Sequence, residues 1–232
     1  MREIKVIGVG GIGCALLPHL ARYLQARGEA VRLTLVDGDA FETRNADRQA
    51  FGRLDNKAKV KAMELAQQFE ELSFRALPEY VRPDNIETII GSGDVVFLGV
   101  DNHATRKLVS DRCGRVAEVT LISGGNDFTD GNVQVYLRRE ARDVTLPLTR
   151  FHPEIANPKD RAPHELTCEE LSREAAPQLL FTNLAVASAM LNAFYGCEVG
   201  KLRYGEVYLD VLEGRANPIR RDPAADAPDA AS

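Results

Sequence analysis

The sequence predicts an α/β fold in which helices cover both faces of an open, mostly parallel β-sheet. Apolar runs of strand length alternate with amphipathic runs of helical length over the first half of the 232 residues. Alternation of this kind favours right-handed crossovers and a parallel sheet. Past residue 130 the runs become alternating and half-exposed, which is typical of antiparallel strands. We therefore expect a Rossmann-like sheet with antiparallel strands added at its C-terminal side.

The elements of the first half follow from apolar spacing. The predicted strands cover residues 3–9, 31–37, 74–80, 94–100 and 119–123, and the predicted helices cover residues 11–27, 55–70, 84–90 and 102–117. The strands are nearly continuous apolar runs, as in sheets that are buried on both faces. Pro18 lies inside the first helix and predicts a kink or a later start of that helix. In the second helix, Leu65 and Phe69 should face inward and the lysines outward.

The elements of the second half are sparser. Asp130-Gly131 is a hairpin signal, and a stretch rich in proline and charge then predicts a long loop of the kind usually kept for function. The later predicted elements are a strand at 132–138, a crossover loop at about 139–165, a helix at 178–195 and a strand at 205–212. The sequence thus predicts one domain over residues 1–220 and a disordered, low-complexity tail over residues 221–232.

Composition and charge argue against several classes of protein. Lysine and arginine number 29 against 34 aspartates and glutamates, so the net charge is −5 and no basic footprint indicates nucleic acid or an anionic membrane. The apolar runs fall far short of the ~20 residues that cross a bilayer. The first strand begins so close to Met1 that we expect no signal peptide. The expected protein is cytoplasmic and binds neither nucleic acid nor membrane.

The cysteines and histidines are scattered. The four cysteines form no Cys-x-x-Cys pair, and the four histidines show no ligand spacing. Structural zinc sites need closely spaced ligands, so we expect reduced thiols and no zinc site. Cys14 has the character of a small packing residue, and His152 and His164 have no visible partner and receive no role.

A glycine-rich turn follows the first strand and precedes the first helix. It contains Gly8, Gly10, Gly11 and Gly13. Glycine lets the backbone turn tightly and approach a phosphate, and the helix N-terminus offers free N–H groups and a positive dipole end. The turn predicts nucleotide binding, with a purely structural tight turn as the alternative.

Two carboxylates end the second strand. Asp37 and Asp39 lie where a carboxylate can accept hydrogen bonds from ribose hydroxyls, so NAD, FAD and ATP all remain open. The alternative is an acidic turn that caps the strand.

The segment after these carboxylates departs from a plain dinucleotide-binding domain. It places Asn45 and Arg48 in the loop that faces the phosphate turn, and Lys59 at the start of the next helix. A planar guanidinium and a mobile ammonium together suit a triphosphate. A solvated helix face is the alternative for these groups, and it is the expected role of Lys57 and Lys61.

Asp101 and Asn102 follow the strand at 94–100. Ligands in open α/β sheets bind beyond the carboxyl ends of the strands, and a carboxylate there can hold Mg²⁺ against phosphates. Aspartate and asparagine are also preferred helix N-caps, so capping is the alternative role of this pair.

Taken together, these places resemble the ThiF/MoeB/HesA family, the adenylating module of ubiquitin-activating enzymes. The matching strings are GVGGIG (8–13), LVDGDAFETRNADRQAF (35–51), AKVKAM (58–63), VFLGVDNHATRKLVSD (96–111) and LISGGNDFTDGNVQVY (121–136). The resemblance runs from about residue 3 to residue 137. The chain also resembles the short ThiF-like proteins that plasmid clusters encode beside a JAB-type peptidase and a ubiquitin-like carrier. It shares their short length and their lack of zinc-binding cysteines.

The resemblance implies an enzyme that joins the C-terminal carboxylate of a small ubiquitin-like or sulfur-carrier protein to AMP, using ATP and Mg²⁺ and releasing pyrophosphate. Carried over by position, it assigns the phosphate turn to Gly8, Gly10 and Gly13, the ribose to Asp37 and Asp39, the phosphates to Asn45, Arg48 and Lys59, and the metal to Asp101. It also implies a homodimer. The helix at 178–195 suits a symmetric apolar contact, although its stripe would serve equally well as core.

Two departures from the family pattern, and one cysteine, bear on function. The paired zinc cysteines are absent. The first predicted strand begins at residue 3, so we expect that the arginine of the family's N-terminal extension, which reaches a neighbouring protomer, is missing or is supplied from elsewhere, with Arg139, Arg142 and Arg150 as possible substitutes. Cys168 lies where some relatives place a thioester- or persulfide-forming residue, and a plain free thiol is the alternative. An NAD- or FAD-linked oxidoreductase and a non-catalytic ThiF-like partner subunit remain as alternative functions.

Overall fold

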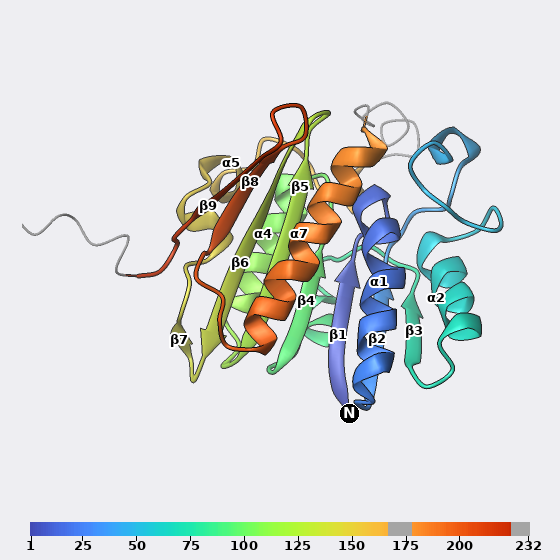
Figure 1. Cartoon of the computed structure of the whole chain (residues 1–232), viewed down its shortest axis with the longest axis horizontal. Helices are drawn as coiled ribbons and strands as arrows, with labels where there is room; N and C mark the ends of the chain where they lie inside the picture. Colours follow the sequence, from blue (N-terminus) through green and yellow to red (C-terminus); the bar gives the residue numbers. More distant parts are fainter. Residues whose placement is uncertain (167–177, 224–232) are drawn as a thin grey trace, which may run out of the picture.

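One nine-stranded sheet organises the part of the chain that the computed structural model describes, residues 1–166 and 178–223 (Figure 1). Its strands are β1 (Arg2–Ile7), β2 (Val31–Val36), β3 (Ser73–Leu77), β4 (Asp94–Leu98), β5 (Val119–Asn126), β6 (Asp130–Arg139), β7 (Arg142–Asp143), β8 (Glu206–Asp210) and β9 (Arg215–Ile219). The order is β3-β2-β1-β4-β5-β6-β8-β9, and β7 pairs with β6. The first five strands pair in parallel and the others antiparallel, which confirms the predicted fold class.

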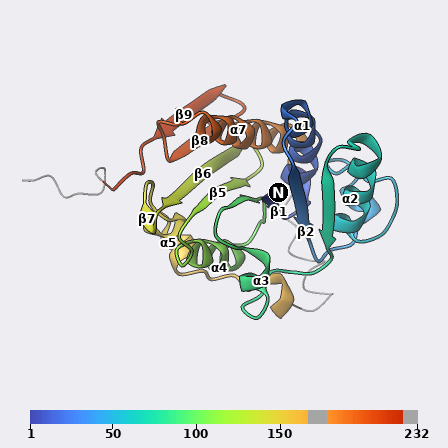
Figure 2. The ribbon, with the colours of Figure 1, turned by 90° about the horizontal axis from the view of Figure 1, so that it is seen from below.

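Helices lie on both faces of this sheet (Figure 2). They are α1 (Gly11–Arg27), α2 (Lys57–Gln68), α3 (Ile86–Ile89), α4 (His103–Cys113), α5 (Pro153–Ala156) and α7 (Leu180–Glu198). Successive strand residues point to opposite faces, so each buried strand feeds two cores. In β1, Ile4 and Val6 join the core under α1, α2 and α7, whereas Ile7 joins the core under α3 and α4.

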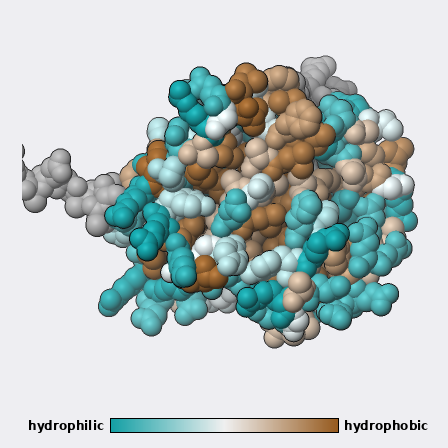
Figure 3. Space-filling model, in the orientation of Figure 1, coloured by the Kyte–Doolittle hydropathy of each residue, from teal (hydrophilic) through white to brown (hydrophobic). Residues whose placement is uncertain are grey.

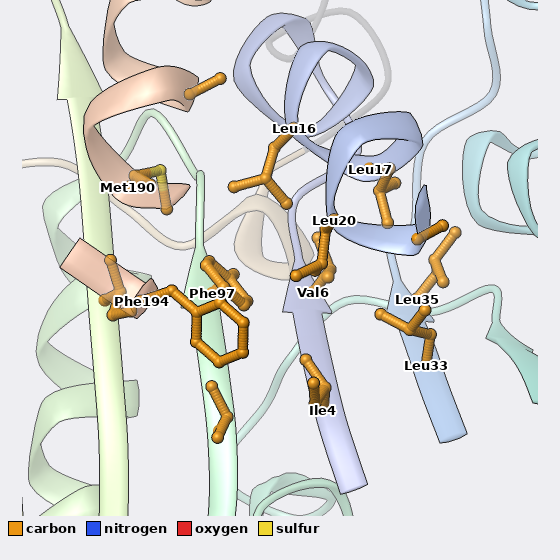
Figure 4. Close-up of a cluster of buried hydrophobic side chains, with 14 of the residues drawn as sticks. Ile4, Val6, Leu16, Leu17, Leu20, Leu33, Leu35, Phe97, Met190 and Phe194 are labelled. Carbon is orange, nitrogen blue, oxygen red and sulfur yellow. The ribbon is translucent and has the colours of Figure 1, made fainter. Parts of the chain in front are cut away.

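The larger core fills the space between the sheet and α1 and α7. Figure 4 shows leucines of α1 and Met190 and Phe194 of α7 directed toward side chains of β1, β2 and β4. Phe97 and Phe194 meet edge to face, with 5.4 Å between ring centroids. Burial of these side chains stabilises the fold by roughly 25 cal/mol for each Å² of apolar surface removed from water.

Several details differ from the sequence prediction. Helix α1 is continuous from Gly11 despite Pro18, so the alternative of a later helix start is wrong. Lys57 and Lys61 are buried, so their predicted outward, solvated position is also wrong. Strand β9 was not predicted, because Pro218 and its exposed polar residues suit only a sheet edge. The crossover loop contains β7 and the short helix α5.

Helix α7 is long and apolar enough, by length and composition alone, to cross a membrane. The expectation from run lengths missed this because Thr182, Asn183 and Asn192 interrupt the apolar runs without adding charge. The inward face of α7 packs in the core, where Val186 and Met190 are almost fully buried.

Candidate functional site

A cavity of about 1500 Å³ opens at the carboxyl ends of the parallel strands. The strand order reverses between β1 and β4, and ligands of open α/β sheets bind at such a switch point. The glycine turn, the end of β2 and the start of α2 line one part of the cavity. The β5–β6 hairpin, the crossover segment 151–166 and Tyr208 line another part.

Tight backbone contacts require the glycines of the turn. Gly8 has a φ of +89°, and a Cβ there would lie 2.7 Å from the carbonyl oxygen of Gly99. A Cβ on Gly13 would lie 2.3 Å from the carbonyl oxygen of Gly8. Helix α1 begins with no side-chain cap on Gly10 and no acidic residue in its first turn, so its first N–H groups are left for an anion.

Asp37 holds the glycine turn through hydrogen bonds to its buried carboxylate. Its carboxylate accepts hydrogen bonds from the N–H groups of Val9, at 2.6 Å, and Asp39, at 2.8 Å. Burial raises the pKa of Asp37 to about 6. Asp39 accepts hydrogen bonds from the Tyr80 hydroxyl and from the Lys57 ammonium. Both carboxylates line the cavity, and their assignment to the ribose stays a prediction. Asp37 also has a structural role, because it holds the turn at the end of the strand.

Arg48 is held in the cavity wall with donor capacity to spare. Its Nη1 donates to Asp47 at 2.9 Å and its Nη2 to Asn45 at 2.8 Å. The side chain is only 12% exposed, and its Nε is buried without a hydrogen-bond partner in the described part of the chain. Arg48 and Asn45 both line the cavity, as expected for groups that face the phosphate turn.

Lys59 does not reach this site. Its side chain is exposed and is not part of the cavity lining. Its backbone N–H is used in the helix cap, where Asn56 Oδ1 accepts it at 3.1 Å. The lysine that lines the cavity is Lys57, whose Nζ lies 3.0 Å from Asp39 Oδ2.

Asp101 and Asn102 divide the two roles proposed for them. Asn102 is the N-cap of α4, and its Oδ1 accepts the Thr105 N–H at 2.8 Å. Asp101 lines the cavity and is exposed, and its carboxylate makes no hydrogen bond or ion pair with any residue that the structure describes. An unengaged carboxylate beside an anion-binding turn fits Mg²⁺, which takes one or two carboxylates together with phosphate oxygens.

Arg106 is a cavity residue that the sequence analysis missed. Its guanidinium donates to Ser123 Oγ and to the carbonyl oxygens of Val100 and Gly124, at 2.7 to 3.0 Å. Burial lowers its pKa to about 10, so it stays charged at neutral pH. It lies on the inward stripe of α4 with Val109 and Cys113. In the sequence, an arginine at an inward position of a predicted helix was the pattern that could have identified this residue.

A second missed group ties the crossover segment to the sheet. His152 Nδ1 lies 2.7 Å from Glu154 and its Nε2 lies 2.8 Å from Glu206. Glu206 is 1% exposed and also accepts from Arg221 Nε at 2.9 Å. Burial alone would raise the pKa of Glu206, but the hydrogen bonds from His152, Arg221 and Gln134 outweigh it and lower the pKa to about 2. His152 therefore has a structural role that the sequence analysis did not assign, because one of its partners, Glu206, lies 54 residues away in the sequence.

The other end of the crossover segment is fixed at α4. The carboxylate of Asp160 accepts the N–H of His103 at 2.6 Å and that of Ala104 at 3.1 Å. Both His103 and Asp160 line the cavity. The segment therefore crosses the cavity edge between two polar anchors.

The remaining predicted residues have mixed outcomes. Burial raises the pKa of Cys14 to about 11, which agrees with a packing role. Cys168 lies outside the described residues. Arg139, Arg142 and Arg150 do not line the cavity, and Arg139 bonds to the amino end of β5. Within residues 1–166 and 178–223, no cluster of three or more metal-ligating side chains exists.

Four side chains of the cavity carry buried polar atoms that lack a partner in the described structure. They are Arg48 Nε, Gln49 Oε1, Asn102 Nδ2 and His103 Nδ1. Leaving such atoms unpaired costs about 1–3 kcal/mol each. Buried polar atoms in folded proteins are satisfied by ordered water or by a bound polar group, and the cavity has room for either.

Comparisons with known proteins find relatives that are named for adenylyl and sulfur transfer. Adenylyltransferase and sulfurtransferase uba4 of Aspergillus niger is 32% identical over 137 residues, which are 57% of this chain and 27% of that protein. Adenylyltransferase and sulfurtransferase MOCS3 of Dictyostelium discoideum is 35% identical over 138 residues, 58% of this chain and 31% of that protein. The matched part therefore spans less than a third of these relatives.

Solved structures share the fold. E. coli MccB crystallised with ATP has a TM-score of 0.70 at 18% identity, covering 96% of this chain and 65% of that chain. PaaA has a TM-score of 0.69 at 17% identity, covering 96% and 64%. The sequence model of the ThiF family matches residues 2–193, which is most of the chain. With the glycine turn, Arg48 and Asp101 meeting in one cavity, this match shows that the chain belongs to the ThiF family.

Proposed function

We propose that the chain catalyses the ATP-dependent adenylation of the C-terminal carboxylate of a small ubiquitin-like or sulfur-carrier protein. The observation that carries this proposal is a single cavity in which the glycine turn, the cationic Arg48 and the unengaged carboxylate of Asp101 meet. Relatives named adenylyltransferases and sulfurtransferases support it. The structural likeness to MccB, which has been crystallised with ATP and with MccA, agrees with it.

The proposed chemistry needs positioning and charge neutralisation more than a base. One oxygen of the acceptor carboxylate attacks the α-phosphorus of ATP and forms a new O–P bond. The bond from that phosphorus to the bridging oxygen breaks, and pyrophosphate leaves with the electron pair. A carboxylate is already ionised at neutral pH, so the protein's task is to bring two anions together and to stabilise the leaving charge.

The residues of the cavity fit that task. N–H groups of the glycine turn and the guanidinium of Arg48 provide donors for phosphoryl oxygens. Asp101 is the residue that would hold Mg²⁺, and the ion when bound neutralises phosphate charge. Phe128, Asn132 and Tyr208 line the part of the cavity over the antiparallel strands, and we assign this part to the acceptor terminus.

Pyrophosphate exchange tests the proposal. The chain incubated with ATP, Mg²⁺, labelled pyrophosphate and candidate carriers ending in Gly-Gly should incorporate label into ATP. Asp101→Ala and Arg48→Ala should each lower the exchange rate by about 10²-fold or more, since each removes a group that stabilises transition-state charge. Arg53→Ala and Asp84→Ala, which lie outside the cavity lining, are matched controls. Exchange that survives both cavity substitutions would refute the site.

A thermal-shift comparison separates the alternatives. Stabilisation by ATP and Mg²⁺ but not by NAD or FAD agrees with an adenylating enzyme, because only a ligand that binds the folded state raises the melting temperature. Stabilisation by NAD or FAD alone would indicate an oxidoreductase. Nucleotide binding without exchange, with every partner present, would indicate a non-catalytic partner subunit.

We also propose that the chain forms a homodimer through the outward face of α7. Leu180, Phe181, Leu184 and Tyr195 of this helix are 38–66% exposed. Apolar side chains gather over α7 in the face shown in Figure 3. Contiguous exposed apolar surface marks interaction sites more often than isolated apolar residues do. The inward face of the same helix packs in the core. Core packing and the proposed dimer contact would therefore use different faces of α7.

A further inference from the structure

Glu206, the first residue of β8, is a buried carboxylate behind the wall of the cavity. The residue is 1% exposed and does not line the cavity itself. A buried carboxylate is costly unless partners hold it, so its surroundings should explain why a charge is kept there. The next residue of the strand, Val207, points to the opposite face of the sheet and packs in the larger core.

Four side chains from three other segments engage this carboxylate. Arg221 Nε donates to Oε2 at 2.9 Å, and His152 Nε2 lies 2.8 Å from Oε1. The amides of Asn132 and Gln134 on β6 donate to Oε1, both at 3.3 Å. One side chain thus joins β6 and β8 to the crossover segment and to the segment after β9.

The pairing of the strands does not require a charge at this position. Main-chain hydrogen bonds join β8 to β6 and to β9, and Glu206 lies opposite Gln134 in the β6–β8 ladder. Replacing a buried ion pair by apolar residues is often neutral for stability. What distinguishes the charged cluster from an apolar contact is the orientation that its hydrogen bonds impose on each partner.

Two partners of Glu206 belong to the wall of the cavity. His152 and Asn132 line it, as does Phe151, and the Arg221 guanidinium lies over the Phe151 ring at 4.2 Å from its centre. These wall residues lie in the part of the cavity that we assign to the acceptor terminus. Within the described structure, no hydrogen bond of Glu206 reaches the glycine turn.

The imidazole of His152 is held from both sides. Glu154 of α5 lies 2.7 Å from Nδ1, while Nε2 contacts Glu206. Both ring nitrogens are therefore occupied, and the ring has one orientation in which both contacts are made. His152 is 8% exposed, so the crossover segment cannot shift at this point without breaking a buried contact.

We propose that Glu206 is a positioning residue that sets the affinity for the acceptor terminus, acting through His152 and Asn132. The proposal rests on the proposed function, because that function places the acceptor terminus against this wall. A peptide terminus that meets a wall already fixed does not have to order it, so less binding energy is lost. Loss of the carboxylate should loosen the acceptor side of the cavity and leave the nucleotide side as it was.

Steady-state pyrophosphate exchange tests this role with a ubiquitin-like carrier protein that ends in Gly-Gly. Glu206→Gln should raise the KM for the carrier at least fivefold and leave the KM for ATP within twofold. Glu213→Gln makes the same charge change on the exposed β8–β9 turn and should leave both KM values unchanged. A merely structural role of Glu206 would instead change both KM values together.

A second variant covers loss of folding in Glu206→Gln. His152→Gln leaves Glu206 paired with Arg221, so it should keep the fold and still raise the KM for the carrier. In the double variant, this KM should rise by less than the product of the two single effects, because residues that share one contact are not independent.

The proposal is overturned if folded Glu206→Gln and His152→Gln variants keep the wild-type KM for the carrier. It is also overturned if the KM values for carrier and ATP rise together, or if the two substitutions act independently. A wild-type chain that shows no exchange with any such carrier would instead overturn the proposed function and this proposal with it.

Discussion

Asp101 and Asn102 show how adjacent residues can serve chemistry and folding separately. Asn102 closes the first turn of α4 with its side chain, and Asp101 presents an unengaged carboxylate to the cavity. Because the capping requirement is met by Asn102, nothing in the helix itself requires the acid at 101. The acid therefore stays available to the Mg²⁺ that we propose for the cavity, while its charge also favours the charged forms of the buried cations Lys57 and Arg106.

This division predicts opposite phenotypes. Asn102→Ala should lower the free energy of unfolding by about 0.5–2 kcal/mol, the usual cost of losing an N-cap. Asp101→Ala should leave stability within about 0.5 kcal/mol, as for surface substitutions without a structural partner. Urea denaturation measures both. Equal destabilisation by the two substitutions would contradict the separation of roles.

The two lysines of α2 mark a limit of prediction from sequence at this scale. An α-helix turns about 100° per residue, so Lys57 and Lys59 point to nearly opposite sides of α2, while Lys57 and Lys61 share one side. The motif alone predicted a cation near residue 59. Which lysine faces the cavity depends on how α2 docks on the sheet, and that is decided by the contacts of Asn56 with Asp37 and Asp39.

At the scale of elements, the crossover segment depends on charge for its position. His152 lies between Glu154 and Glu206, and Arg221, Gln134 and Asn132 also bond to Glu206. Burial opposes the charged imidazole, but the two carboxylates outweigh it and raise the pKa of His152. The segment that edges the cavity is thus held by a histidine whose charged form is favoured by the two carboxylates.

This anchor predicts a pH dependence of stability. A raised folded-state pKa means that the His152 contribution is complete below the unfolded value of about 6.5 and is lost as the pH rises through the raised pKa. The lowered pKa of Glu206, about 2, means that its contribution is present above its unfolded value and is lost as the pH falls toward 2. On the alkaline side, the wild type should therefore lose stability faster than His152→Gln.

Urea denaturation between about pH 5.5 and pH 9 measures this difference, since it spans the ordinary range of histidine titration. His19→Gln on the exposed side of α1 is the matched control and should follow the wild type. Parallel stability curves for the wild type and His152→Gln would contradict the assigned anchor.

Sequence reasoning was most successful for elements whose burial is complete. The parallel strands are continuous apolar runs, and the start and end of α1 at Gly11 and Arg27 agree with the prediction. It failed for β9, whose residues make only edge contacts and include a proline. It also left the crossover segment as a loop, because its anchors join residues far apart in sequence.

At the scale of the whole molecule, the outward face of α7 predicts association. Leu184→Lys should convert a dimer into a monomer, because it places a charge in the apolar contact, whereas Leu212→Lys on the β8–β9 turn should not. Sedimentation velocity over a range of concentrations measures the outcome. A wild-type chain that stays monomeric, or a Leu184→Lys variant that stays dimeric, would contradict the proposed interface.

The interlocked backbone at the switch point has a consequence for the energetics of ligand capture. Gly8 donates to the Val36 carbonyl oxygen at the end of β2, and it packs so closely against Gly99 after β4 that a Cβ would clash there, so the ends of three strands are joined in the absence of a ligand. The conformational entropy of this backbone is therefore lost when the chain folds, and ligand binding does not have to order it again. Preorganisation of this kind leaves more of the intrinsic binding energy for catalysis.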